Sequence, residues 1–105
     1  MDTPVRYEHR RVHVDGDMTV YTCGELKSHL LEQLTAHPDT TELDLSHVIE
    51  IDTAGLQLLL TARRHASDGG RELRVINPSR AVSEMLELCR LGAFLAPADT
   101  AAGAP

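Results

Sequence analysis

One hydroxyl group in this sequence is well placed for chemistry, that of Thr53 in the segment Asp52-Thr53-Ala54-Gly55-Leu56. The residues before it, 42–51, alternate between polar and apolar and then run apolar through Ile49, as in a buried strand. After it, leucines recur at helical spacing: Leu56, Leu59 and Leu60. The segment is therefore predicted to join a strand to a helix, where backbone N–H groups point outward and ligands or partners bind in α/β folds.

The sequence leaves two roles open for the Thr53 hydroxyl. Thr53 is predicted to be the helix N-cap, with Asp52 just outside the helix, where the helix dipole favours negative charge. A hydroxyl at this position is also exposed enough to be modified. Gly55 lies in the first turn, where alanine would be the better helix former by about 1 kcal/mol. We attribute Gly55 to close approach of a partner or of neighbouring backbone, and expect Gly55→Leu to weaken partner binding while leaving the fold largely intact.

An enzyme is the rival class, because four aspartates lie near predicted strand ends: Asp15, Asp17, Asp44 and Asp52. Phosphoryl transfer needs carboxylates that hold a metal and usually a Lys or Arg that meets the phosphoryl group. The only lysine of the chain is Lys27, in the first predicted helix. The sequence has no Gly-rich phosphate loop and no motif for a nucleophilic triad, and its six histidines lack metal-site spacing. We therefore predict no catalysis, no cofactor and no metal.

Composition narrows the class of partner. A chain of 105 residues predicts a single domain, and a net charge of −6 disfavours nucleic acid and anionic membranes, which require a basic face. Cys23 and Cys89 lack motif spacing and are predicted to be reduced thiols in or near the core. The N-terminus does not resemble a signal peptide, and no apolar run approaches the ~20 residues that span a bilayer. These features predict a cytoplasmic protein with no membrane insertion and a protein partner.

Strands are predicted to alternate with helices along the chain. Residues 5–14 predict one or two strands, Asp15-Gly16-Asp17 a hairpin turn, and 18–20 the returning strand. A helix follows, with a capping box at Thr22-Cys23-Gly24-Glu25 and a stripe of three leucines, and it ends at His37-Pro38. The stripe consists of Leu26, Leu30 and Leu34.

The second half of the chain predicts strand and helix twice more. A strand at 41–45 precedes the Thr53 segment, and Gly69-Gly70 ends the helix that follows. A strand over 73–76 leads to a last helix that Ser79 caps. Its buried stripe is predicted to be Val82, Met85, Leu86 and Cys89. This order predicts an α/β fold, with helices packed on a mixed sheet of four to five strands.

Three matches in order resemble the STAS family, the sulfate-transporter and anti-sigma-factor-antagonist domains. Asp44-Leu45-Ser46 followed by residues 51–56 is similar to the family signature. Residues 16–19 with Thr22 resemble its Gly-Glu-Leu-Asp segment and the Thr that opens its first helix. Residues 77–79 with Val82, and then Leu91-Gly92, resemble its closing strand, loop and helix. The resemblance runs from about residue 12 to 94, and it departs at Thr19, where antagonists that bind an anti-sigma kinase often carry Asp.

The resemblance implies a STAS domain over 5–95, between a flexible lead-in at 1–4 and a disordered tail at 96–105. In regulatory members of the family, a partner kinase phosphorylates the Ser or Thr directly after the Asp, which here is Thr53. The chain would then be a free-standing bacterial switch that acts in transcription regulation and signal transduction. It would bind an anti-sigma factor or similar Ser/Thr kinase when unphosphorylated, and a phosphatase would reset it. The implied partner-binding residues are Asp17, Thr19, Thr22, Asp52, Thr53, Ala54, Gly55 and Leu56.

A second function within the same fold stays open at this point. The chain could be a cytoplasmic STAS subunit of an ABC-type lipid (phospholipid) transporter, in which the Thr contributes to docking on the ATPase. Residues 53–60 suit either function. A kinase and a phosphatase encoded beside this gene would favour the switch, and a permease and an ATPase would favour the transporter.

Overall fold

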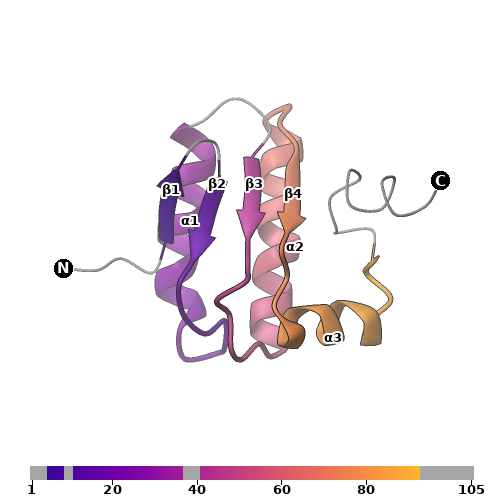
Figure 1. The fold of residues 1–105 in the computed structure, drawn as a ribbon. Coiled ribbons are helices and arrows are strands. Elements are labelled where there is room, and N and C mark those ends of the chain that lie inside the picture. The colour runs from indigo at the N-terminus through magenta and orange to yellow at the C-terminus, as the bar shows by residue number, and fades with distance from the viewer. Residues whose placement is uncertain (1–4, 9–10, 37–40, 93–105) are drawn as a thin grey trace.

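Four strands and three helices make up the described part of the chain. The computed structural model describes residues 5–8, 11–36 and 41–92 (Figure 1). In chain order the elements are β1 (Val5–Glu8), β2 (Arg11–Val14), α1 (Cys23–Ala36), β3 (Thr41–Asp44), α2 (Thr53–Asp68), β4 (Leu73–Ile76) and α3 (Arg80–Leu88). The predicted lead-in at 1–4, the tail at 96–105 and the predicted domain end at 93–95 lie outside these residues.

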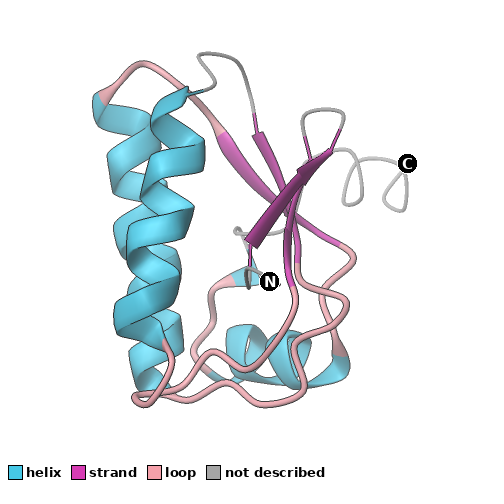
Figure 2. Ribbon diagram, turned by 90° about the vertical axis from the view of Figure 1, so that its left-hand side faces the viewer, coloured by secondary structure: helices cyan, strands magenta, loops and turns pink. Residues whose placement is uncertain are grey.

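The strands form one mixed sheet in the order β1-β2-β3-β4. β1 pairs antiparallel with β2, whereas β2, β3 and β4 pair in parallel. Each parallel pair is joined through a helix, because parallel neighbours need a long crossover. Figures 1 and 2 show α1 and α2 side by side on one face of this sheet, with α3 beyond the carboxyl ends of β2, β3 and β4. The predicted mixed α/β fold is confirmed.

The core lies between the sheet and the two long helices. Val12, Leu43 and Val75 are direct neighbours across β2, β3 and β4, and all three are fully buried. The predicted leucine stripe of α1 is buried against them, at 1–2% exposure. From α2, the buried residues recur at helical spacing, which places one face of the helix in the core. They are Gly55, Leu56, Leu58, Leu59, Ala62 and Ala66.

The predicted hairpin at Asp15-Gly16-Asp17 is wrong. β2 is paired with β1 on one side and with β3 on the other, so neither of its edges is free to receive a returning strand. Met18 instead forms an isolated parallel bridge with Ile51. Its N–H donates to the Glu50 carbonyl at 2.9 Å, and its carbonyl accepts from the Asp52 N–H at 3.2 Å. The segment predicted as a strand therefore lies against the residues that lead into α2.

The strand before the Thr53 segment also ends earlier than its apolar run predicts. β3 stops at Asp44, and the following residues cross to α2 as a loop. Val48 is buried in this loop, but Ile49 is 79% exposed. Of these two apolar neighbours, Val48 belongs to the core, whereas Ile49 lies on the surface.

The ends of the last two helices test the predicted caps. α2 ends at Asp68 before Gly69-Gly70, and Ser79 caps α3 by accepting from the Val82 N–H at 3.2 Å, so both predictions are confirmed. The predicted burial of Cys89 is wrong, because this residue follows the last turn of α3 and is exposed. Cys23 and Cys89 are both free thiols, as expected.

Candidate functional site

Asp52, and not Thr53, is the N-cap of α2. Its Oδ1 accepts from the N–H groups of Ala54 and Gly55, at 2.9 and 3.2 Å. Its backbone is extended, with φ −119° and ψ −169°, whereas Thr53 is already the first helical residue. The predicted capping role of Thr53 is therefore wrong by one residue. Asp is as good a cap as Thr, so the local sequence suited both assignments.

The consequence for Thr53 is that its hydroxyl is left available. Thr53 is exposed at the start of α2, and its side chain makes no hydrogen bond to any residue in the described ranges. Ala54 beside it is partly exposed. A hydroxyl that caps no helix and faces solvent is free to meet a partner or to be modified without breaking a structural contact.

The second oxygen of Asp52 ties a neighbouring loop to this helix end. Its Oδ2 accepts from the Val20 N–H at 3.0 Å. The Asp17 carboxylate makes a similar link, since its Oδ1 accepts from the Glu50 N–H at 3.2 Å. Together with the Met18 bridge, these bonds fix the loop before α1 against the start of α2. Asp17, Thr19 and Thr22, predicted from the first half of the sequence, therefore lie beside Thr53.

Thr19 and Thr22 stabilise the turn that directly precedes α1. The Thr22 Oγ1 accepts from the Thr19 N–H at 2.9 Å, and the Thr19 Oγ1 accepts from the Tyr21 N–H at 3.3 Å. These bonds close a turn over residues 19–22 and, with the bond from Thr22 to the Asp17 carbonyl, occupy the Thr22 hydroxyl that the capping box predicted over 22–25 needs. The spacing of Thr19 and Thr22 was the signal that could have revealed it. The two threonines thus act first as structural supports of the loop.

Electrostatics keep the Asp52 carboxylate ionised. The hydrogen bond from the Val20 N–H, together with those from Gly55 and Ala54, holds the pKa of Asp52 below its usual value. Burial and the nearby Asp52 charge raise the pKa of the Cys23 thiol, at the start of α1. The thiol is therefore a poor nucleophile, since the thiolate is the reactive form. The helix end presents a fixed negative charge next to the free Thr53 hydroxyl.

Gly55 and Leu56 are buried and do not face solvent. A Cβ added to Gly55 would lie 2.2 Å from the Met18 carbonyl oxygen and 2.8 Å from the Ile51 side chain. Of the two reasons predicted for this glycine, close approach of neighbouring backbone is the one that the structure contains. The expectation that Gly55→Leu leaves the fold intact is therefore wrong, because no larger side chain fits without displacing the Met18 bridge.

Sequence reasoning missed the exposed apolar side chains on the two segments that lie next to the start of α2. Tyr21 is 94% exposed and Val20 65% exposed, in the loop that Asp52 holds. Ile49 is exposed on the segment that leads into α2. Val20 had been placed in a returning strand and Ile49 in a buried one, because apolar residues are more often inside. Their exposure is what a protein-binding surface requires.

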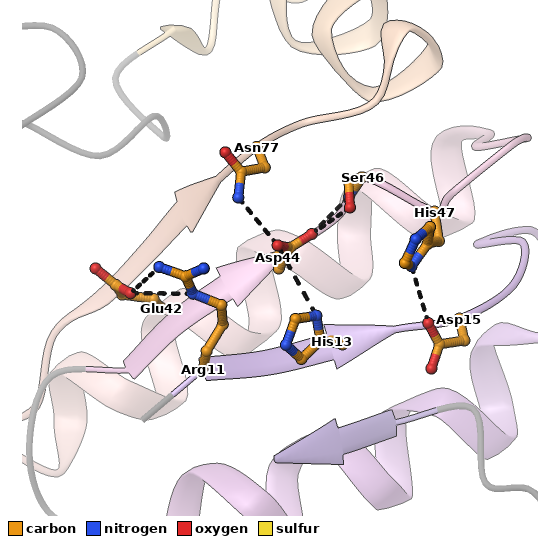
Figure 3. Close-up of polar contacts among 8 residues, drawn as sticks. All are labelled: Arg11, His13, Asp15, Glu42, Asp44, Ser46, His47 and Asn77. Carbon is orange, nitrogen blue, oxygen red and sulfur yellow. Dashed lines mark hydrogen bonds and ion pairs between the residues drawn. The ribbon is translucent and has the colours of Figure 1, made fainter. Parts of the chain in front are cut away.

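A separate polar network lies at the carboxyl end of β3, as Figure 3 shows. The buried Asp44 carboxylate accepts from Ser46, through the hydroxyl at 2.6 Å and the N–H at 2.9 Å, and from the Asn77 amide at 3.0 Å. Burial alone would raise the pKa of Asp44, but the bonds from Ser46 and Asn77 outweigh it, and its pKa is lowered. This network fixes the loop that begins at Leu45. Its role is structural.

The lowered pKa of Asp44 predicts a pH effect on stability. A carboxyl whose pKa is lower in the folded state stabilises the fold above its unfolded pKa of about 3.9, and this contribution is lost as pH falls through the folded value. We expect the free energy of unfolding to fall more steeply between about pH 5 and pH 2 for the wild type than for Asp44→Asn. Urea denaturation at several pH values measures the two slopes. Parallel slopes would contradict this assignment.

The four aspartates considered for metal-dependent chemistry do not form one site. Asp15 pairs with His47 at 3.1 Å, Asp17 and Asp52 hold backbone N–H groups, and Asp44 belongs to the network above. In the described ranges, no group of three or more His, Cys, Asp or Glu side chains is arranged to hold a metal ion. No helix among those residues is long and apolar enough to cross a membrane.

Comparison with known protein families gives a match over nearly the whole chain. A family model described as the Mlab STAS domain matches residues 3–97. The match covers every described helix and strand, including both segments that lie around Thr53.

Several solved structures have the same fold. TM1081 from Thermotoga maritima, a candidate anti-sigma factor antagonist, is 19% identical, with a TM-score of 0.72 over 88% of this chain and 81% of its own. The anti-sigma factor antagonist SpoIIAA in its unphosphorylated form is 16% identical, with a TM-score of 0.69 over 88% and 84%. A STAS domain protein from Planctomyces limnophilus is 14% identical, with a TM-score of 0.69 over 87% and 84%. At these identities the likeness establishes the fold.

Proposed function

Because this chain belongs to the STAS domain family, we propose that it is a non-catalytic binding protein switched by phosphorylation of Thr53. Its partner is an anti-sigma factor or a similar Ser/Thr kinase of a bacterial cytoplasm, bound when Thr53 is unphosphorylated. A cognate phosphatase restores the binding form. The observation that carries the proposal is the free, exposed Thr53 hydroxyl at the start of α2, directly after a carboxylate that already caps the helix.

The surface around Thr53 supports a protein partner. Val20 and Tyr21 on one side and Ile49 on the other are exposed apolar side chains that a partner can bury. Asp17, Thr19 and Thr22 hold the loop that presents two of them. Gly55 and Leu56 contribute from below the surface, by fixing the position of the first turn of α2.

A phosphate on Thr53 would change the charge of this surface more than its structure. Phosphorylation adds a charge of about −1.5 to −2. The N–H groups of Ala54 and Gly55 could otherwise donate hydrogen bonds to the phosphate, but they already donate to the Asp52 carboxylate. The new charge would therefore project beside an ionised carboxylate and oppose burial in an interface. This arrangement favours release of the partner without unfolding of the switch.

Peptide mass mapping tests the modification site. The full chain is incubated with its cognate kinase and ATP, and we expect the phosphate on Thr53 and none in Thr53→Ala. The control hydroxyls are Ser46, which bonds to Asp44, and Ser79, which caps α3. Phosphate on Ser46 or Ser79 with none on Thr53 would disprove the assignment. No phosphate with any encoded Ser/Thr kinase would contradict the switch and leave docking on a transporter ATPase as the competing function.

A further inference from the structure

A groove of about 360 Å³ separates α3 from the segment that leads into α2. Its α3 wall is a single helix face, because Ala81, Met85 and Leu88 follow one another at spacings of four and three residues. The opposite wall contains Ile49 and Ile51. The groove therefore has an apolar side chain on both walls along its length.

The apolar walls of this groove are strongly exposed. Leu88 is 80% exposed and Ile49 is 79% exposed, although burial of such side chains stabilises a folded protein. Scattered exposed apolar residues are ordinary, but Leu88 and Ile49 line the same groove and so belong to one patch. Such a patch is typical of an interaction site.

The charge of the groove indicates the chemistry of its occupant. The two charged residues that line it, Glu50 and Glu84, are both acidic and exposed. Arg80, which does not line the groove, pairs with Glu84 at 3.1 Å, but both side chains are exposed, so the pairing screens the Glu84 charge only weakly. A groove lined by apolar side chains and two glutamates, on a chain of net charge −6, fits an amphipathic segment with basic flanks.

The groove is continuous with the Thr53 surface. Ile51 in its wall directly precedes Asp52, the cap of α2, and Ile49 belongs to both surfaces. The nine residues of α3 span about 13 Å, enough to lie beside two to three turns of a second helix. One partner can therefore cover Thr53 and place a helix in the groove at the same time.

We propose that this groove receives a basic amphipathic helix of the same partner that contacts Thr53. The identity of that partner rests on the function proposed above, whereas the groove and its chemistry rest on α3 and residues 49–51. Thr53, Val20 and Tyr21 do not line the groove, so the groove contact adds affinity that a phosphate on Thr53 does not directly oppose.

A methyl NMR titration of the full chain tests the groove without the partner. The probe is a synthetic 14-residue helix with leucine on one face and lysine on the other, compared with the same peptide in which every lysine is glutamate. We expect the lysine peptide to shift the methyl signals of Ile49, Met85 and Leu88, and the glutamate peptide to leave them unchanged. Shifts spread evenly over the protein, or shifts with both peptides, would overturn the proposal.

Leu88→Lys removes an apolar contact and adds a repelling charge, and Ser67→Lys adds the same charge at the far end of α2 as the control. Both residues are exposed, so neither substitution should disturb the fold. We expect the lysine peptide to bind Leu88→Lys about tenfold more weakly and Ser67→Lys within about twofold of the wild type. Equal losses in both variants would reduce the effect to net charge and overturn the groove assignment.

Two other occupants have their own signatures in the same spectra. Methyl shifts that depend on protein concentration alone would assign the groove to a second copy of this chain. Nuclear Overhauser contacts between Leu88 and residues after Gly92 would assign it to the chain's own C-terminal segment. Either result would overturn the proposal.

The outcomes also separate this inference from the proposed function. If Thr53 is never phosphorylated but the lysine peptide still shifts the Leu88 methyls, the groove stands and the switch fails. If Leu88→Lys binds the partner kinase as tightly as the wild type while Thr53→Glu does not, the switch stands and the groove assignment fails.

Discussion

Gly55→Ala is expected to destabilise the fold by about 2 kcal/mol, although alanine is the better helix former by about 1 kcal/mol. The added Cβ would lie 2.2 Å from the Met18 carbonyl oxygen, a distance that no packed pair of these atoms adopts. Overpacking in a rigid environment costs about 1–3 kcal/mol or more, and here the obstacle is backbone. The clash therefore outweighs the helix propensity.

Thermal unfolding measures this effect, and Gly24→Ala is the matched control. Gly24 also lies near the start of a helix, but nothing lies within 4 Å of its added Cβ. We expect Gly55→Ala to lower the melting temperature by roughly 10 °C and Gly24→Ala to leave it unchanged or raise it by a few degrees. If both variants melt alike, the tight packing of α2 on the Met18 bridge is not a determinant of this fold.

Elements whose signals are local could be predicted from the sequence. The buried stripe of α1, the glycine pair after α2 and the Ser79 cap each depend on residues within one or two turns of one another. The strands that alternate with helices predicted the α/β class for the same reason. The leucine spacing after residue 55 predicted a helix that begins near Thr53, and α2 begins there.

The errors arose where distant residues decide the outcome. Asp52 as cap is supported by the Val20 N–H, which lies 32 positions away in the sequence and donates to the carboxylate oxygen that the helix N–H groups leave free. Residues 15–17 do not form a hairpin turn, because β2 is paired with β1 on one edge and with β3 on the other. The apolar pattern predicts that Ile49 is buried, but its neighbour Val48 occupies the core and Ile49 is exposed. Such competition cannot be seen in a local pattern.

Thr53→Glu is expected to weaken binding of the partner roughly 10- to 100-fold without unfolding the protein. The carboxylate would lie next to the ionised Asp52 and would have to lose its hydration in the interface. At the start of α2 the helix dipole partly offsets the repulsion from Asp52, so the melting temperature should stay within about 4 °C of the wild type.

Two further variants at Thr53 distinguish the effect of side-chain charge on partner binding from the effects of side-chain size and of phosphorylation. Thr53→Gln has nearly the shape of Thr53→Glu without its charge, and we expect it to bind at least several-fold more tightly than Thr53→Glu. Thr53→Ala should bind as the wild type does and should not be released by the kinase. Binding that is equally weak for Gln and Glu would show that the interface rejects bulk at this position, and electrostatic release would then be wrong.

The most direct measurement compares the affinity of the partner kinase for this chain before and after stoichiometric phosphorylation of Thr53, by isothermal titration with a nonhydrolysable nucleotide present. The melting temperature of each form is recorded in the same buffer. We predict that phosphorylation weakens binding at least about tenfold, while the melting temperature stays within about 4 °C. Unchanged affinity, or a loss of affinity that accompanies early unfolding, would contradict the account.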